Sequence, residues 1–272
     1  MMQWIDTYAV LLMALLLIAA AGGFFALQRH PNAVVGTQAS NPSAWMVWGW
    51  WALSLVAALG LAAMTAHVQA GLAVAPDSFP AAGMAQSAWV DWLALDEGVQ
   101  HWVQMQGDAA WLPAVNALTQ LGHVGWMALL GLLTCAWLLQ RRAWLLAGAW
   151  ALGVAGVGLW IRILKVAIGR DRPEVQWVVE HGYSFPSGHS AGTLVCYGLL
   201  VWVLVRLLRP THSCLWAALA ALLVLAVGCS RILLGVHYVS DVVGGWLLGL
   251  AWLACVLGLT AMAERWMART TS

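Results

Sequence analysis

Apolar and polar segments alternate along the chain. A helix that crosses a membrane needs about 20 mostly apolar residues, and stretches of this kind cover residues 7–27, 45–68, 122–140, 143–164, 190–208, 214–235 and 241–262. The pattern predicts an all-α fold, a polytopic bundle of seven transmembrane helices. Asp6 precedes the first stretch and Arg29 follows it, which is not the charge order of a secretory signal, so we interpret this stretch as a spanning helix.

Positive charge falls on alternate connections of this seven-span arrangement. It is carried by Arg29, by the pairs Arg141 with Arg142 and Arg206 with Arg209, and by Arg265 and Arg269 near the C-terminus. The connection formed by residues 69–121 contains no Lys or Arg. Because Lys and Arg are retained on the cytoplasmic side, we expect the N-terminus outside and the C-terminus inside.

The 69–121 connection also contains a stretch with helical spacing of its apolar residues, which are Trp92, Leu93, Val99, Trp102 and Val103. Two interpretations fit this spacing. The helix either lies on the membrane surface or packs against the loops that carry the polar motifs.

The composition supports a membrane protein, since 62% of the residues are hydrophobic and 8% are charged, against roughly 25% charged in soluble domains. The net charge of +1 comes from scattered residues, so no nucleic-acid partner is indicated. The five cysteines lack the CxxC spacing of zinc or redox sites, and we interpret them as small core residues. We interpret the 20 tryptophans as residues of the membrane interfaces.

Three polar clusters interrupt the apolar pattern, at residues 165–173, 184–190 and 230–241. The first two are joined without an intervening span, and two spans separate the second from the third. All three clusters are therefore predicted on one side of the membrane, opposite the Arg-rich connections.

The residue types in these clusters suit the hydrolysis of a phosphate ester. The transition state of phosphoryl transfer spreads negative charge over oxygens that fixed donors must hold. Lys165, Arg172 and Arg231 supply positive charge. Ser187 and the Gly188 amide stand where a helix is predicted to begin, and free N–H groups there bind anions.

A nucleophile and its partners can also be assigned. His237 and Asp241 are four residues apart and can share one helical face, where the carboxylate would fix the imidazole tautomer. His237 is then the candidate nucleophile. His189 is left as the general acid for the leaving oxygen and as the base that later activates water.

The alternative is that these residues are ordinary juxtamembrane cations and helix caps. Several cations at bilayer depth are costly, however, and an anion would justify them. A metal site is disfavoured because the clusters offer only Asp171 and Asp241 as carboxylates, so no metal and no cofactor are predicted. Arg162 is interpreted as a residue that snorkels or pairs inside the bundle, and Arg170 as a surface charge.

Together the motifs resemble the signature of the type 2 phosphatidic acid phosphatase superfamily, K-x6-RP, then PSGH, then SR-x5-H-x3-D. They are matched by Lys165 with Arg172 and Pro173, by Pro186 to His189, and by Ser230, Arg231, His237 and Asp241. The resemblance implies a six-helix core, metal-free hydrolysis, and the same roles for His237, Asp241 and His189. Residues 41–272 would form that core domain, and residues 1–40 would add an extra N-terminal helix.

The function hypothesis that follows is a lipid phosphatase of the bacterial inner membrane with its site facing the periplasm or exterior. Undecaprenyl diphosphate, phosphatidylglycerophosphate, phosphatidic acid and lipid A phosphate are the candidate substrates, with polyprenyl diphosphate slightly favoured by family analogy. The alternatives are a lipid-to-lipid phosphotransferase and a non-catalytic lipid carrier. The family also resembles vanadium haloperoxidases, so vanadate is expected to inhibit.

Overall fold

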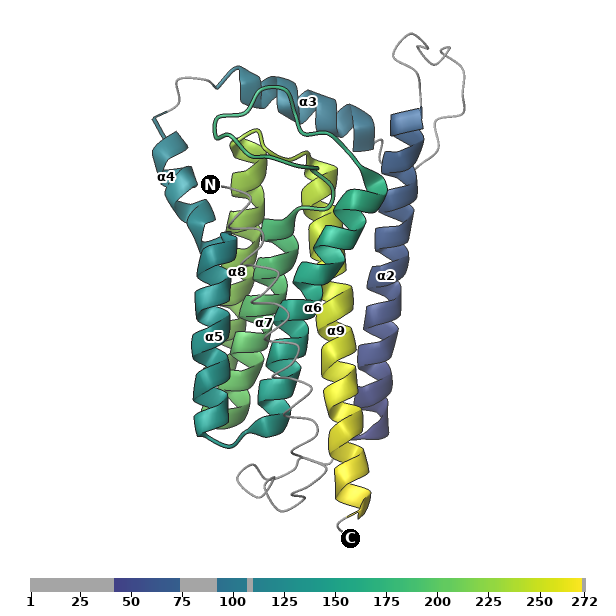
Figure 1. The fold of residues 1–272 in the computed structure, drawn as a ribbon, viewed down its shortest axis with the longest axis vertical. Helices are drawn as coiled ribbons and strands as arrows, with labels where there is room; N and C mark the ends of the chain where they lie inside the picture. Colours follow the sequence, from purple (N-terminus) through teal and green to yellow (C-terminus); the bar gives the residue numbers. More distant parts are fainter. Residues whose placement is uncertain (1–41, 74–91, 107–109, 271–272) are drawn as a thin grey trace.

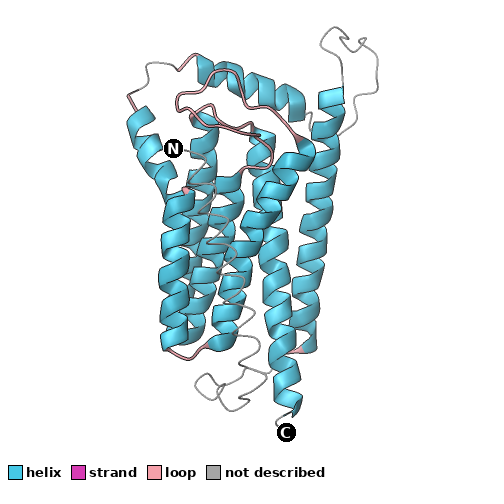
Figure 2. Ribbon diagram, viewed as in Figure 1, coloured by secondary structure: helices cyan, strands magenta, loops and turns pink. Residues whose placement is uncertain are grey.

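The computed structural model describes residues 42–73, 92–106 and 110–270, and the predicted span at 7–27 lies outside them. The described chain is a bundle of helices joined by loops (Figures 1 and 2). The helices are α2 (Ala44–Ala73), α3 (Trp92–Gln104), α4 (Leu112–Thr119), the 3-10 turn η2 (Gln120–Gly122), α5 (Val124–Gln140), α6 (Trp144–Ile168), α7 (Gly188–Leu208), α8 (Ser213–Leu233) and α9 (Val239–Thr270).

Six of the predicted spans are present in the described residues as helical segments long and apolar enough to cross a membrane. One differs at its start. The span predicted at 122–140 is preceded by α4 and η2, so that the whole segment runs from Leu112 to Gln140. The chain bends at His123, whose backbone is extended and whose Nδ1 accepts a hydrogen bond from the Gly125 amide as the cap of α5.

Helix α9 packs along α2, α6 and α7. Small residues allow this close packing, as is usual between membrane helices. A side-chain carbon added at Gly156 of α6 would lie 2.2 Å from the Trp252 ring of α9. One added at Gly228 of α8 would lie 2.4 Å from the Trp246 ring.

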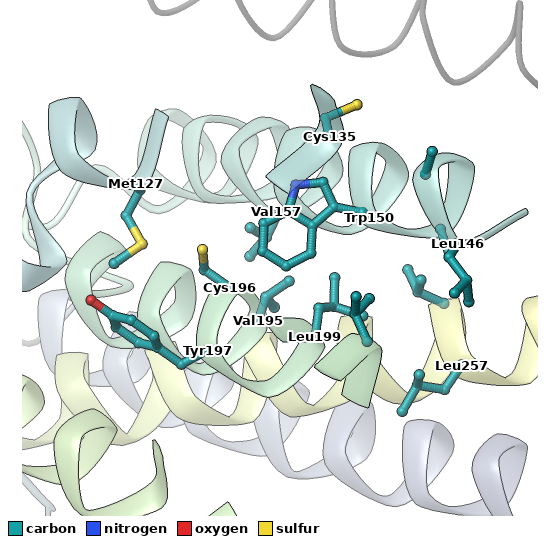
Figure 3. Close-up of a cluster of buried hydrophobic side chains, with 14 of the residues drawn as sticks. Met127, Cys135, Leu146, Trp150, Val157, Val195, Cys196, Tyr197, Leu199 and Leu257 are labelled. Atoms are coloured by element: carbon teal, nitrogen blue, oxygen red, sulfur yellow. The ribbon is translucent and has the colours of Figure 1, made fainter. Parts of the chain in front are cut away.

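A large hydrophobic cluster is formed by residues of α5, α6 and α7, with contributions from α8 and α9, and it includes Trp150 (Figure 3). The Trp150 side chain is fully buried, and its indole N–H donates to the Gly131 carbonyl at 2.9 Å. The interpretation of the tryptophans as interfacial is therefore wrong for Trp150. An indole can be buried between helices when its one polar group finds a backbone acceptor.

The prediction that the cysteines are core residues is correct for some of the five. All five lie in the described residues and are free. Cys135 and Cys196 are buried in the core as predicted, whereas Cys214 and Cys229 on α8 are exposed on the outer surface of the bundle. In a membrane helix an apolar residue can face outward at no cost, so hydrophobicity alone does not separate core from surface.

The ends of α6 and α8 and the starts of α7 and α9 lie at the same end of the bundle, which brings the three polar clusters together. Helix α3 lies across this end, over the loops that join α6 to α7 and α8 to α9 (Figure 1). Of the two interpretations of this helix, the structure therefore supports packing against the loops. Its exposed face carries Leu95 and Trp102.

Candidate active site

The second and third motifs are joined by backbone contacts at the start of α7. Ser187 is the N-cap residue, and its hydroxyl accepts from the Ser190 amide at 3.4 Å. The Ser187 amide donates to the Asp241 carbonyl at 2.9 Å. Gly245 permits this approach, since a side-chain carbon there would lie 2.5 Å from the Ser187 carbonyl oxygen. Gly188 opens the helix, so its amide is among the N–H groups that have no partner within α7.

His237 and Asp241 form the predicted pair. His237 Nδ1 lies 3.3 Å from Asp241 Oδ2, which also accepts from the Tyr238 amide at 2.9 Å. His237 Nε2 lies 3.3 Å from an Arg172 guanidinium nitrogen, which is a donor only. These partners assign the proton to Nδ1 and leave the lone pair of Nε2 facing Arg172.

His237 is 2% exposed. Burial lowers the pKa of its imidazole well below the ordinary value, and the positive charges of Lys165 and Arg172 lower this pKa further. His237 is therefore held as the neutral ring, which is the form that carries a nucleophilic lone pair.

Arg172 and Lys165 are anchored by backbone carbonyl groups. Arg172 donates from Nε to the Gly182 carbonyl at 2.9 Å and from Nη1 to the Val236 carbonyl at 2.8 Å. Lys165 donates to the carbonyls of Tyr183 and Ser184. Two cations from the first motif therefore converge on the loop before α7.

Arg231, the third predicted cation, is buried and donates to Thr119 Oγ1 at 3.1 Å and to Glu180. The other carboxylate oxygen of Glu180 lies 3.9 Å from Arg172. Glu180 thus bridges two of the predicted phosphate-binding arginines, which sequence reasoning missed because no motif or periodicity marks it. Burial alone would raise the pKa of Glu180, but the charge and hydrogen bond of Arg231 outweigh it, and the net pKa is lowered.

His189 lies near the start of α7, beside η2. A side-chain carbon at Gly122 of η2 would lie 2.9 Å from His189 Cδ2, so glycine lets this turn pack against the imidazole. His189 is the second residue of α7, so it lies at the same end of the bundle as the other two motifs. The structure therefore brings all eight predicted site residues to one end of the bundle.

Arg170 lies inside the protein and not at its surface. The expectation of a surface charge is wrong, because Arg170 is buried and pairs with Asp241 at 2.8 Å and with Asp96 at 2.9 Å. Asp96 comes from α3 and is also buried. Sequence reasoning missed both. The one available signal was that Asp96 interrupts the apolar spacing of α3, which favours a buried polar contact over a solvated position. Arg162, by contrast, is exposed in the structure.

Comparison with known proteins decides the family. A model of the PAP2 superfamily matches residues 142–265, a range that contains all three motifs. The decaprenylphosphoryl-5-phosphoribose phosphatase of Mycobacterium tuberculosis is 34% identical over 142 residues, which are 51% of this chain and 74% of that protein. The chain belongs to the PAP2 superfamily.

Two further similarities extend the PAP2 match. Phosphatidylglycerophosphatase B of Bacillus subtilis is 37% identical over 107 residues, or 38% of this chain, and the match spans about half, 53%, of that relative. A crystal structure of a transmembrane PAP2 type phosphatidylglycerolphosphate phosphatase from Bacillus subtilis superimposes with a TM-score of 0.61 at 26% identity, over 74% of this chain and 94% of that one. The predicted family, the multi-pass helical membrane fold and the assignment to a class of phosphatases are thereby confirmed.

Proposed function

We propose that this PAP2 protein is a lipid phosphatase that works through a phosphohistidine on His237. The observation that carries the proposal is the pairing of His237 Nδ1 with Asp241, while Nε2 faces Arg172 among three cations. A neutral imidazole beside guanidinium and ammonium groups is suited to attack a phosphorus atom whose oxygens those cations hold.

The proposed reaction has two steps, transfer of the phosphate to His237 and its release by water. In the first, His237 Nε2 forms a bond to phosphorus, the bond from phosphorus to the leaving oxygen breaks, and that oxygen takes a proton from His189. In the second, water attacks phosphorus and gives a proton to His189 while the phosphorus–nitrogen bond breaks. Inorganic phosphate leaves, and both histidines return to their starting states. Lys165, Arg172, Arg231, Ser187 and the Gly188 amide are the proposed phosphate donors, and no metal ion is needed in either step.

The proposed substrate is a membrane lipid carrying a terminal phosphate. Support comes from the position of the site at the end of a bundle of membrane-spanning helices, where a phosphate head group would meet it while the tail stays in the bilayer. Two relatives are named for phosphatidylglycerophosphate and for a decaprenyl-linked phosphoribose. These join undecaprenyl diphosphate, phosphatidic acid and lipid A phosphate as the classes to test.

The proposed location is the outer edge of a bacterial inner membrane. Residues 69–121, which include α3 beside the site, contain no Lys or Arg, whereas Arg141, Arg142 and Arg209 lie at the opposite end of the bundle. The positive-inside rule then puts the C-terminus in the cytoplasm. The test is a C-terminal fusion to a fluorescent protein that folds only in the cytoplasm. The fusion is expected to be bright. A dark fusion that inserts normally in the membrane would show that the orientation is the opposite one.

Phosphate release by detergent-purified protein tests the activity, with each candidate lipid supplied in the presence of EDTA. We expect release from one class of lipid, and a loss of at least about a thousandfold in His237→Ala, since removal of a nucleophile removes the covalent path. His212→Ala is the matched control, because His212 lies at the opposite end of the bundle. Full activity in His237→Ala would refute the mechanism.

The phosphotransferase alternative uses the same first step and differs in the acceptor. A labelled phosphate donor and an unlabelled lipid acceptor distinguish the two. Labelled inorganic phosphate supports hydrolysis, and labelled lipid supports transfer. A lipid carrier would release neither product.

A further inference from the structure

Helix α3 contributes two buried polar side chains to the active site. Asp96, 2% exposed, accepts from Arg170 at 2.9 Å through Oδ2 and from the Ser240 amide at 2.9 Å through Oδ1. Gln100, 5% exposed, donates to the His237 carbonyl at 3.0 Å. These contacts tie a helix outside the three PAP2 motifs to Arg170, to Ser240 and to the backbone of the nucleophile itself.

Arg170 lies between two carboxylates. Its Nη2 donates to Asp96, and its Nη1 donates to Asp241 Oδ1 at 2.8 Å and to Ser240 Oγ at 2.7 Å. The guanidinium also stacks over the Tyr238 ring, 4.0 Å from its centroid. Removing three charges from water is costly unless they are paired and hydrogen-bonded, and here every partner is supplied by the protein.

Asp241 divides its two oxygens between opposite partners. Oδ1 faces Arg170, whereas Oδ2 faces His237 Nδ1 at 3.3 Å. In a buried site the Arg170 cation alone would cancel much of the negative potential that Asp241 exerts on His237. The Asp96 carboxylate on the far side of Arg170 offsets that cation, so that the group of three retains a net charge of −1.

This balance matters when the phosphohistidine forms. As Nε2 bonds to phosphorus while Nδ1 keeps its proton, the imidazole becomes positively charged, and negative potential from Asp241 stabilises that charge. We propose that Asp96 is a positioning residue of the nucleophile: by neutralising Arg170 it leaves the Asp241 charge available to orient and stabilise His237. This inference rests on the proposed function.

The first test is Asp96→Asn in the full-length protein, with phosphate release measured under saturating and limiting lipid. Asparagine keeps the size and an acceptor but removes the charge. We expect kcat to fall about tenfold or more, with KM within about twofold, because the phosphate-binding cations are untouched. The matched control is Glu97→Gln, the same change of charge on the adjacent residue of α3, which is exposed and is expected to have no effect.

A second variant separates the charge from a merely structural role. In Asp96→Asn with Arg170→Gln, the uncompensated cation is removed together with the carboxylate, and glutamine can still donate to Asp241. If charge balance is the role of Asp96, the double variant has a higher kcat than Asp96→Asn alone. If Asp96 only holds the fold together, the double variant is equally impaired or worse, and that result would overturn the proposal.

Vanadate binding gives a readout that does not depend on turnover, since vanadate takes the place of phosphate at the nucleophile. We expect Asp96→Asn to weaken vanadate binding about tenfold and the double variant to recover part of that loss. Equal affinity in Asp96→Asn and Glu97→Gln would overturn the proposal. The two proposals can fail separately. If the variants show this pattern of vanadate affinity but the wild-type protein releases no phosphate from any lipid, the proposed phosphatase is refuted and the role of Asp96 is kept.

Discussion

Glu180 and Arg231 form an ion pair inside the predicted phosphate site, through one oxygen of the carboxylate and the Nη2 nitrogen of the guanidinium. The other Glu180 oxygen lies 3.9 Å from Arg172. Glu180 belongs to a loop, and its side chain is 29% exposed. A phosphate that binds between the two arginines has to replace this carboxylate.

Glu180→Gln is therefore expected to strengthen the binding of anions. Removing the competing charge leaves both arginines to the phosphate, so KM and the inhibition constant of vanadate are expected to fall, each by about tenfold, or about 1.4 kcal/mol. Initial rates against lipid and vanadate concentration measure both. Glu174→Gln, an exposed carboxylate on the same loop, is the control. A rise in both constants would show that Glu180 instead orients the arginines.

The general-acid role of His189 predicts a dependence on the leaving group. His189→Ala is expected to reduce release from an alkyl phosphate by about 10² to 10⁴. The loss is expected to be much smaller with p-nitrophenyl phosphate, because nitrophenolate leaves without a proton. Comparison of kcat/KM for the two substrates in the variant and in His212→Ala measures the difference. This ratio reports the first step, whereas the water step that also uses His189 is common to both substrates. Equal losses would remove His189 from this role.

The lowered pKa of His237 predicts how stability depends on pH. The unfolded chain takes up a proton at His237 at about pH 6.5, whereas the buried ring in the folded protein resists protonation until well below that value. The free energy of unfolding is therefore unaffected by His237 above about pH 6.5 and falls as the pH drops below it. Melting in detergent from pH 8 to 5 measures this, and His237→Gln, which cannot titrate, is expected to show a shallower decline. Identical slopes would show that His237 titrates alike in both states.

Helix packing predicts a contrast between two glycines of α6. A methyl group at Gly156 meets the rigid Trp252 ring at 2.2 Å, whereas one at Gly148 meets nothing within 4 Å. Gly156→Ala is expected to lower stability by about 1–3 kcal/mol through overpacking. Gly148→Ala is expected to be neutral or slightly stabilising, because alanine favours a helix. Melting temperatures of the two variants in one detergent test this, and equal values would mean that α9 shifts freely.

Much of the site was predictable because it is encoded locally. Apolar stretches of membrane-spanning length predicted the six spans found in the described residues, since partition into a bilayer depends on the composition of each segment alone. The four-residue spacing of His237 and Asp241 predicted their pairing, but not its geometry, because only Asp241 is on α9 and His237 lies in the loop just before that helix. The common side of the three motifs followed from counting spans between them.

Only the tertiary structure decided which charges pair. Asp96 and Ser240 are 144 residues apart, and Glu180 meets Arg231 across the end of the bundle. Arg170 looked like a surface charge because a guanidinium in a loop is usually solvated. Its burial depends on α3 covering the loops and supplying a second carboxylate. Such partners are chosen by packing between distant segments, and no spacing along the chain records that packing.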